Sequence, residues 1–188
     1  MFGQYTQVVL IFTMVNMMSA KINILKIISG HLNTLKDATT NKISIQDYGT
    51  FFIVPLLFSI LFYFLSYQLS DHITTLLVTF GAIFTPLLLS VLVLVYEQSE
   101  KLNNKKSEDF EYRLNIKKQL LKELFSNICY AILVSMALVF MCFIDTIIGN
   151  LKLNIIPIIS PIVVFLTLNL FLTILMVVKR LYSLLIAD

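Results

Sequence analysis

The strongest constraint on this chain is the arrangement of its apolar residues, which form two blocks on either side of one charged segment. The first block, residues 51–96, contains no lysine or arginine, and the second, residues 127–178, is interrupted by Asp145 and by a short stretch around Lys152. An apolar helix needs about 20 residues to cross the roughly 30 Å of bilayer hydrocarbon. Each block is therefore long enough for two crossings joined by a tight turn.

Composition agrees with this interpretation. The chain has 188 residues, of which 58% are hydrophobic, and its mean hydropathy is +0.88, whereas soluble proteins are about 45–50% apolar even when glycine is counted. The longer segments outside the apolar blocks are residues 1–45 and 97–126, and neither is large enough to form an enzyme domain with its own hydrophobic core. We expect an all-α polytopic membrane protein with four transmembrane helices arranged as two hairpins.

The same pattern divides the chain into five segments. We expect an N-terminal cytoplasmic or interfacial helical segment at 1–44, a first transmembrane hairpin at 45–96, a cytoplasmic helical linker at 97–126, a second hairpin at 127–178 and a short cytoplasmic tail at 179–188. Basic residues that flank membrane helices stay in the cytoplasm, and here they precede the first crossing, fill the linker and follow the fourth crossing. Both termini should therefore be cytoplasmic. Abundant Ile, Leu, Asn and Lys without Trp is typical of an AT-rich genome, and we therefore expect a bacterial inner (plasma) membrane.

Residues 8–35 have apolar side chains at spacings of three and four, which predicts an N-terminal amphipathic helix. Three interpretations remain open for it. It could lie in the cytoplasmic interface, associate with copies of itself through its near-heptad spacing, or form a fifth crossing. The polar, glycine-containing stretch 30–41 should end or bend the helix.

Local signals place the ends of the first hairpin. Ser44 and Asp47 fit a capping box, so crossing one should begin near Ile45 and continue to Gln68, with a kink at Pro55. Asp71 is positioned to cap crossing two, expected over 73–96.

The second hairpin has different expected boundaries. No proline or glycine occurs between residue 107 and Gly149, which predicts one continuous helix over 107–148. Its first half would project into the cytoplasm, and its second half would form crossing three. Crossing four is expected over 153–178.

Catalytic motifs are missing from the sequence: it contains no HExxH, GxSxG, CxxC, P-loop or GxGxxG pattern. The two histidines, His31 and His72, fall on opposite sides of the membrane in the expected topology. No three ligands of the His and Cys type could then meet at one depth. We expect no enzymatic activity, no metal and no cofactor.

Two polar residues inside the apolar blocks are candidates for function. Asp145 could be an interfacial acid near Lys152, or one of a ring of carboxylates at a pore mouth. Asn169 could hold the bundle together by an interhelical hydrogen bond, or line a pore as a polar ring. Its expected partners are four small hydroxylated residues, Thr79, Thr85, Ser90 and Ser135.

A basic face on the cytoplasmic linker is the candidate binding surface, and it consists of Arg113, Lys117, Lys118 and Lys122. It could attract anionic lipid headgroups, dock a soluble cytoplasmic protein, or bind nucleic acid. Glu108, Glu111 and other acids dilute its positive field, so direct nucleic-acid binding is not expected.

In its size, hairpin–loop–hairpin layout and composition, the chain resembles the small membrane subunits of bacterial anti-phage operons, such as the four-span subunit of the Kiwa system. The resemblance implies an inner-membrane homo-oligomer that works with a soluble cytoplasmic partner and responds to infection. Combined with the missing catalytic motifs, it predicts a non-enzymatic scaffold or sensor that couples a membrane disturbance to that partner. The alternative is a pore or channel effector that depolarises the membrane.

Overall fold

The computed structural model describes residues 24–35, 45–104, 111–150 and 156–186, and these ranges contain helices joined by one short connection. Four helical stretches are long and apolar enough to cross a membrane, namely Gln46–Phe64, Asp71–Leu102, Leu114–Gly149 and Ile158–Leu184. The expected all-α fold with two transmembrane hairpins is confirmed. The elements are α2 (Leu25–Thr34), α3 (Ile45–Tyr48), the π-helical turn η2 (Gly49–Ile53), α4 (Val54–Phe64), α5 (Asp71–Asn104), α6 (Glu111–Asn150) and α7 (Ile156–Ile186).

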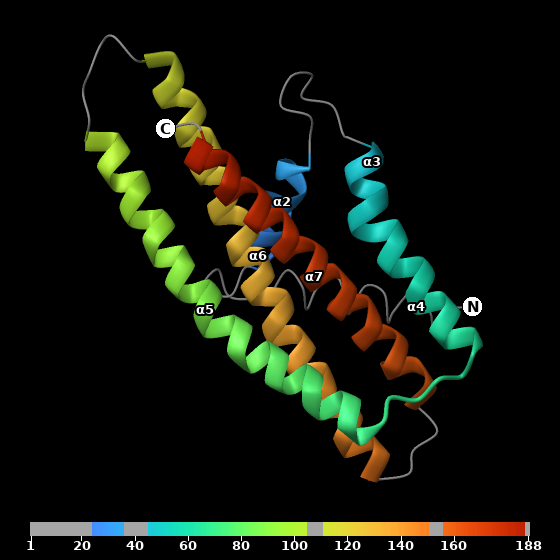
Figure 1. Cartoon of the computed structure of the whole chain (residues 1–188). Helices are drawn as coiled ribbons and strands as arrows, with labels where there is room; N and C mark the ends of the chain where they lie inside the picture. The colour runs from blue at the N-terminus through green and yellow to red at the C-terminus, as the bar shows by residue number, and fades with distance from the viewer. Residues whose placement is uncertain (1–23, 36–44, 105–110, 151–155, 187–188) are drawn as a thin grey trace, which may run out of the picture.

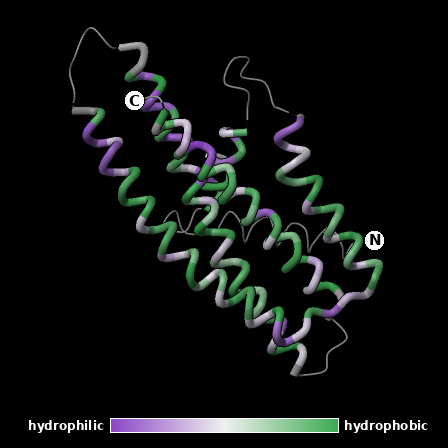
Figure 2. The backbone as a smooth tube through the Cα atoms, viewed as in Figure 1, coloured by the Kyte–Doolittle hydropathy of each residue, from purple (hydrophilic) through white to green (hydrophobic). Residues whose placement is uncertain are grey.

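Helix α6 is the centre of the bundle, since it packs against α5, α7 and α2, while α4 packs against α7 (Figure 1). The beginnings of α3 and α6 lie at the same end of the bundle as the ends of α5 and α7. We call this the basic end, because it carries Lys101, Lys117, Lys118, Lys122, Lys179 and Arg180. Hydrophobic residues dominate the helices between this end and the opposite one, where Asp71 begins α5 (Figure 2).

The first crossing begins at Ile45, as predicted, but it is not a uniform α-helix. Pro55 has no N–H and its ring clashes with the carbonyl four residues earlier, which belongs to Phe51. The structure accommodates this with the π-helical turn η2 directly before Pro55, at the start of α4. The carbonyl of Phe51 is thereby left without the N–H that an α-helix would supply.

The first crossing ends at Phe64 and not at Gln68, so this predicted boundary is wrong. Ser66 adopts φ 50°, a left-handed conformation that cannot continue the helix. The Tyr67 N–H donates to the Phe62 carbonyl at 3.2 Å, the Ser66 N–H donates to the Tyr63 carbonyl at 3.0 Å, and the rings of Tyr67 and Phe62 meet edge to face. These contacts form a Schellman C-cap, with serine at the position that glycine usually occupies.

Helix α5 differs from its prediction at both ends. Ser70 caps it, not Asp71, since the Ile73 N–H donates to the Ser70 hydroxyl at 3.4 Å and Asp71 is already the first helical residue. The helix then continues to Asn104, two turns past the expected end at Tyr96. Gly81 allows α5 to approach α6 closely, because a Cβ there would lie 2.6 Å from Cγ2 of Val139.

The predicted continuity of the third crossing with the linker is confirmed over the described residues. Helix α6 runs through 40 residues without interruption, which corresponds to a length of about 60 Å. Its predicted beginning at residues 107–110 lies outside the described part of the chain. Helix α7 continues to Ile186, beyond the expected end at Val178, with Pro161 inside its first turns.

Helix α2 covers the last third of the predicted N-terminal helix and ends within the expected stretch, at Thr34. It packs against α6, its buried residue is His31, and Leu35, which directly follows the helix, is also buried. Gly30 makes the close approach possible, because a Cβ there would lie 3.0 Å from Oγ of Ser126. Helix α2 is not among the four apolar stretches, and residues 8–23, on which the three interpretations of this segment depend, lie outside the described part.

Candidate functional site: a buried polar junction

Polar side chains from α2, α6 and α7 meet inside the bundle around His31. We call this group the polar junction, and its members are His31, Thr34, Asn127, Tyr130, Asn169 and the backbone carbonyl of Phe51. The side chains come in pairs spaced three residues apart on α2 and on α6, so each pair shares one face of its helix. His31, Asn127 and Asn169 are fully buried.

His31 is held by one hydrogen bond and one ring contact. Its Nδ1 lies 2.9 Å from Oδ1 of Asn127, and because an amide oxygen only accepts, the imidazole carries its proton on Nδ1. Its ring stacks on Tyr130 with centroids 3.9 Å apart and planes 1° from parallel. Nε2 is buried and has no hydrogen-bond partner among the described residues.

This environment disfavours a charged imidazole. Burial lowers the pKa of His31 to about 4, the hydrogen bond to Asn127 opposes that shift, and the nearby Arg180 guanidinium adds to it. His31 is therefore neutral at neutral pH, and its protonation would place a charge in a site built for an uncharged ring.

Thr34 adds a second link between α2 and α6. Its hydroxyl lies 2.7 Å from both Oδ1 of Asn127 and the carbonyl of His31, so one proton is shared between two acceptors. Asn127 Oδ1 thus accepts hydrogen bonds from both α2 side chains, while its Nδ2 has no hydrogen-bond partner among the described residues. Both side-chain hydrogen bonds from α2 to α6 therefore end on this single amide.

Asn169 connects the junction to α7 and to the first crossing. The Tyr130 hydroxyl donates to Oδ1 of Asn169 at 2.9 Å, and Nδ2 of Asn169 donates to the carbonyl of Phe51 at 2.9 Å. Pro55 removes the helical partner of that carbonyl, and the amide replaces it. Both ends of the Asn169 side chain are satisfied within one chain.

Arg180 closes the junction at the basic end. Its Nη1 forms an ion pair and hydrogen bond with Oε2 of Glu123 on α6, and its Nη2 donates to the carbonyl of Thr34 at 2.9 Å. Thr34 is the last residue of α2, where carbonyls lack helical partners and attract cations. One guanidinium therefore joins α2, α6 and α7.

The hydroxyl residues expected to partner Asn169 have other partners. Thr85 and Ser135 hydrogen-bond to each other across the α5–α6 contact, and Ser135 also donates to the carbonyl of Gly81 at 3.3 Å. Thr79 donates to the carbonyl of Thr75 and Ser90 to that of Pro86, each four residues earlier in the same helix, and both side chains are exposed. The structure thus gives Asn169 an interhelical role with partners that the sequence did not indicate.

Asp145 lies buried on α6 near the end opposite the basic end, with 9% of its surface exposed. Its Oδ1 has no hydrogen-bond partner among the described residues. Lys152, the expected partner, lies outside the described part. Asp145 and the polar junction are therefore separate sites.

The predicted basic face occupies the first turns of α6. Lys122 is exposed, whereas Lys117 and Lys118 are half-buried. The backbone of Arg113 lies in the first turn, and its side chain is outside the described part. In the ranges that the structure describes, no three His, Cys, Asp or Glu residues gather as they would around a metal ion.

No family model, curated protein or solved structure matches this chain. The geometry of the bundle is therefore the basis for inferring a function. Most of the polar junction was not predicted from the sequence: His31 was considered only as a metal ligand and rejected, and Asn127 only marked the start of an apolar block. The available signal was the three-residue spacing of His31 with Thr34 and of Asn127 with Tyr130.

Proposed function

We propose that this chain is a non-enzymatic scaffold or sensor of a bacterial inner membrane, which passes a membrane disturbance to a soluble cytoplasmic partner through α6. The observation that carries the proposal is the length of α6. A helix of 40 residues is about twice as long as the bilayer hydrocarbon requires. If its second half spans the membrane, its first half projects from the basic end and moves with it as one rod.

The contacts of α6 support the transmission of such a movement. Within the described residues α6 packs on α5, α7 and α2, and the polar junction ties α2 and α7 to its middle. A tilt of α6 would therefore change the Glu123–Arg180 ion pair and the contacts of His31 with Asn127 and Tyr130 at the same time. The resemblance to small membrane subunits of anti-phage operons suggests infection as the source of the disturbance and a homo-oligomer as the working form.

The basic face is the proposed contact for the partner, and a photo-crosslinking amino acid at Ile116 tests it. Ile116 is 41% exposed on the projecting half of α6, whereas Phe143, 60% exposed on the half proposed to span the membrane, is the matched control. In cells under native expression, position 116 should crosslink a discrete soluble protein, and position 143 should crosslink only lipid or membrane protein.

Charge reversal then identifies the surface responsible. Lys118→Glu with Lys122→Glu should abolish the soluble adduct at position 116, because the contact depends on the basic face. Lys101→Glu, at the same end of the bundle but on α5, should leave it unchanged. Lipid adducts alone at position 116, or a soluble adduct that survives the double reversal, would rule out this contact.

The channel alternative needs polar side chains that face water along an oligomer axis. Asn169 is fully buried, and both ends of its amide bond within the chain. Because no observation favours a conducting pore, we propose the scaffold or sensor alone.

A further inference from the structure

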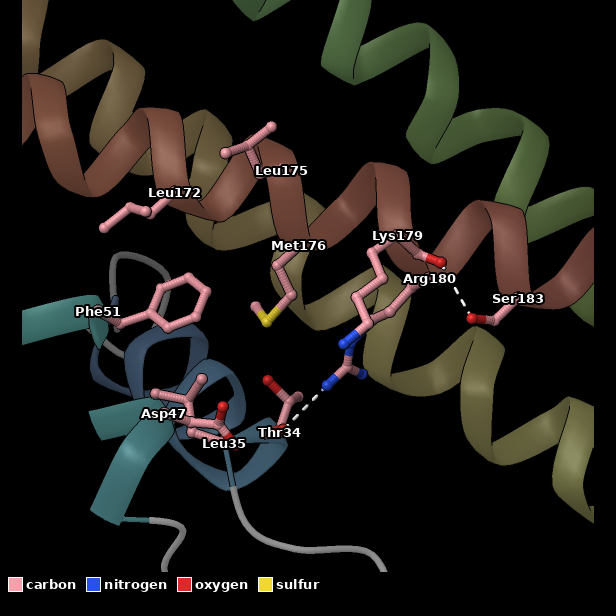
Figure 3. A pocket seen from close by; sticks show the side chains of 10 residues that line it. All are labelled: Thr34, Leu35, Asp47, Phe51, Leu172, Leu175, Met176, Lys179, Arg180 and Ser183. Atoms are coloured by element: carbon pink, nitrogen blue, oxygen red, sulfur yellow. Dashed lines mark hydrogen bonds between the residues drawn. The ribbon is translucent and has the colours of Figure 1, made fainter. Parts of the chain in front are cut away.

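A cavity at the basic end has the polarity of a lipid-binding site. It has a volume of about 320 Å³ and lies between α7, the end of α2 and the beginning of the first crossing (Figure 3). Its apolar lining includes Phe51, Leu172, Leu175 and Met176, and its polar lining includes Lys179, Arg180 and Ser183. Small-molecule sites commonly begin at about this volume and combine apolar walls with a few fixed polar groups.

The lining is graded along one stripe of α7. Leu172, Leu175, Met176, Lys179 and Ser183 recur at spacings of three and four, so they share one face of the helix. The stripe runs about 16 Å from its apolar to its polar end, toward the basic end of the bundle (Figure 3). A glycerophospholipid has the same gradient, from acyl chain through phosphate to headgroup.

The two cations of the cavity differ in what they already contact. Arg180 is held by Glu123 and by the Thr34 carbonyl. Lys179 is exposed, and no carboxylate of the described residues lies within ion-pair distance of it. Asp47 is the one acid in the lining, and its single negative charge does not balance the two positive charges of Lys179 and Arg180. An anionic group entering the cavity would therefore meet Lys179 first, beside a guanidinium whose position is fixed.

We propose that this cavity binds the phosphate of one glycerophospholipid, with the phosphate at Lys179 and Arg180 and an acyl chain along Leu172, Leu175 and Phe51. The site does not require a cytoplasmic partner, so it holds whether or not the proposed scaffold or sensor role is correct. Its ligand would also touch Arg180, the residue that joins α2, α6 and α7.

Native mass spectrometry of the full chain in detergent tests the site with three probes. Phosphatidylglycerol should bind at one molecule per chain. Diacylglycerol with the same acyl chains lacks the phosphate and should bind at least fivefold more weakly. Inorganic phosphate lacks the acyl chains and should not displace phosphatidylglycerol at equal concentration. Equal binding of diacylglycerol would show that the site does not recognise the phosphate, and displacement by inorganic phosphate would show that it binds free phosphate and not a phospholipid; either result would overturn the proposal.

Two lysine variants separate this site from general attraction of lipid to the basic end. Lys179→Met keeps the apolar stem and should weaken phosphatidylglycerol binding about fivefold, the effect of one basic residue near a membrane surface. Lys101→Met removes an exposed charge on α5, away from the cavity, and should have no effect. Because Lys179 is exposed, its removal should leave the thermal unfolding of the protein unchanged. Equal losses in both variants, or none in Lys179→Met, would overturn the proposal.

Discussion

At the scale of single residues, His31 should make the protein sensitive to acid. Its pKa is about 4 in the folded protein, compared with 6.5 for an unperturbed histidine. Between pH 4 and pH 6.5 the folded state therefore binds fewer protons than the unfolded state. The contribution of neutral His31 to the free energy of unfolding should be fully present above pH 6.5. It should be lost as the pH drops toward 4, which lowers the free energy of unfolding by on the order of 3 kcal/mol. Thermal unfolding followed by circular dichroism between pH 7.5 and 4.5 measures this.

The His31 ring contacts Asn127 and Tyr130 from α6 and Phe51 from η2, and the charged Arg180 from α7 acts on it electrostatically. Of these, Arg180 pairs with Glu123. His31→Phe preserves an aromatic ring against Tyr130 but cannot titrate, so it should flatten the pH dependence over this range. His72→Gln, at an exposed position, should retain it. If the wild-type slope persists in His31→Phe, another group is responsible.

Asn169 and Pro55 should be energetically coupled through the carbonyl of Phe51. Asn169→Leu removes the hydrogen bonds to that carbonyl and to the Tyr130 hydroxyl, which should lower the free energy of unfolding by about 1–3 kcal/mol. Pro55→Ala returns an N–H four residues after Phe51, so the loss from Asn169→Leu should be about 1 kcal/mol smaller in that background.

A double-mutant cycle on the free energy of unfolding measures the coupling. Thr79→Val is the matched control, because its exposed hydroxyl bonds only within α5, and its cost should be near zero in both backgrounds. Strictly additive losses for Asn169→Leu and Pro55→Ala would mean that the amide does not substitute for the missing helical donor.

At the scale of elements, run length and charge were enough to predict the four crossings. Membrane helices must satisfy their backbone internally, so a long apolar stretch has few alternatives. The lack of proline and glycine between residue 107 and Gly149 is why α6 was expected as one helix. The missed boundaries depend on details with weak sequence signals. Ser66 takes a conformation usually given to glycine, and Ser70 caps α5 although Asp71 beside it is an equally good capping residue.

The polar junction could not be predicted because it depends on contacts between distant parts of the chain. His31 and Asn127 are 96 residues apart, and Asn169 lies 118 residues from Phe51. Spacing within one helix indicates which side chains share a face, but it does not identify the helix they meet. The sequence identified Asn169 as a residue that needs a partner, and the fold supplied a tyrosine and a carbonyl freed by proline.

The docking of α2 should depend on close approach at Gly30. Gly30→Leu would drive a side chain into Ser126, whose Oγ would lie only 3.0 Å from the new Cβ, and should separate α2 from α6. Hydrogen exchange of the backbone amides of α2 should then accelerate by at least tenfold, while the amides of α5 remain protected. Gly149→Leu, where a Cβ meets nothing within 4 Å, should leave exchange in α2 unchanged. Unaltered protection in Gly30→Leu would mean that α2 does not need this approach.

At the scale of the whole molecule, the charge asymmetry of the bundle predicts its orientation. Among the side chains that the structure describes, the basic end carries Lys101, Lys117, Lys118, Lys122, Lys179 and Arg180, and the opposite end carries Asp71, His72 and Asp145. Basic residues near membrane helices are retained in the cytoplasm. The basic end should therefore be cytoplasmic, and the turn between α4 and α5 should face outward.

Single cysteines report this orientation once the native Cys129 and Cys142 are replaced, because both are free thiols. Gln68→Cys lies in the outward turn, while Ile116→Cys and Ile186→Cys lie toward the basic end, and all three positions are exposed. In intact spheroplasts a membrane-impermeant maleimide should label only position 68, since the bilayer shields the other two, and lysis should make all three reactive. Labelling of position 116 or 186 before lysis would place the basic end outside the cell. No cytoplasmic protein could then reach the projecting half of α6, so the same measurement decides whether the proposed partner contact is possible.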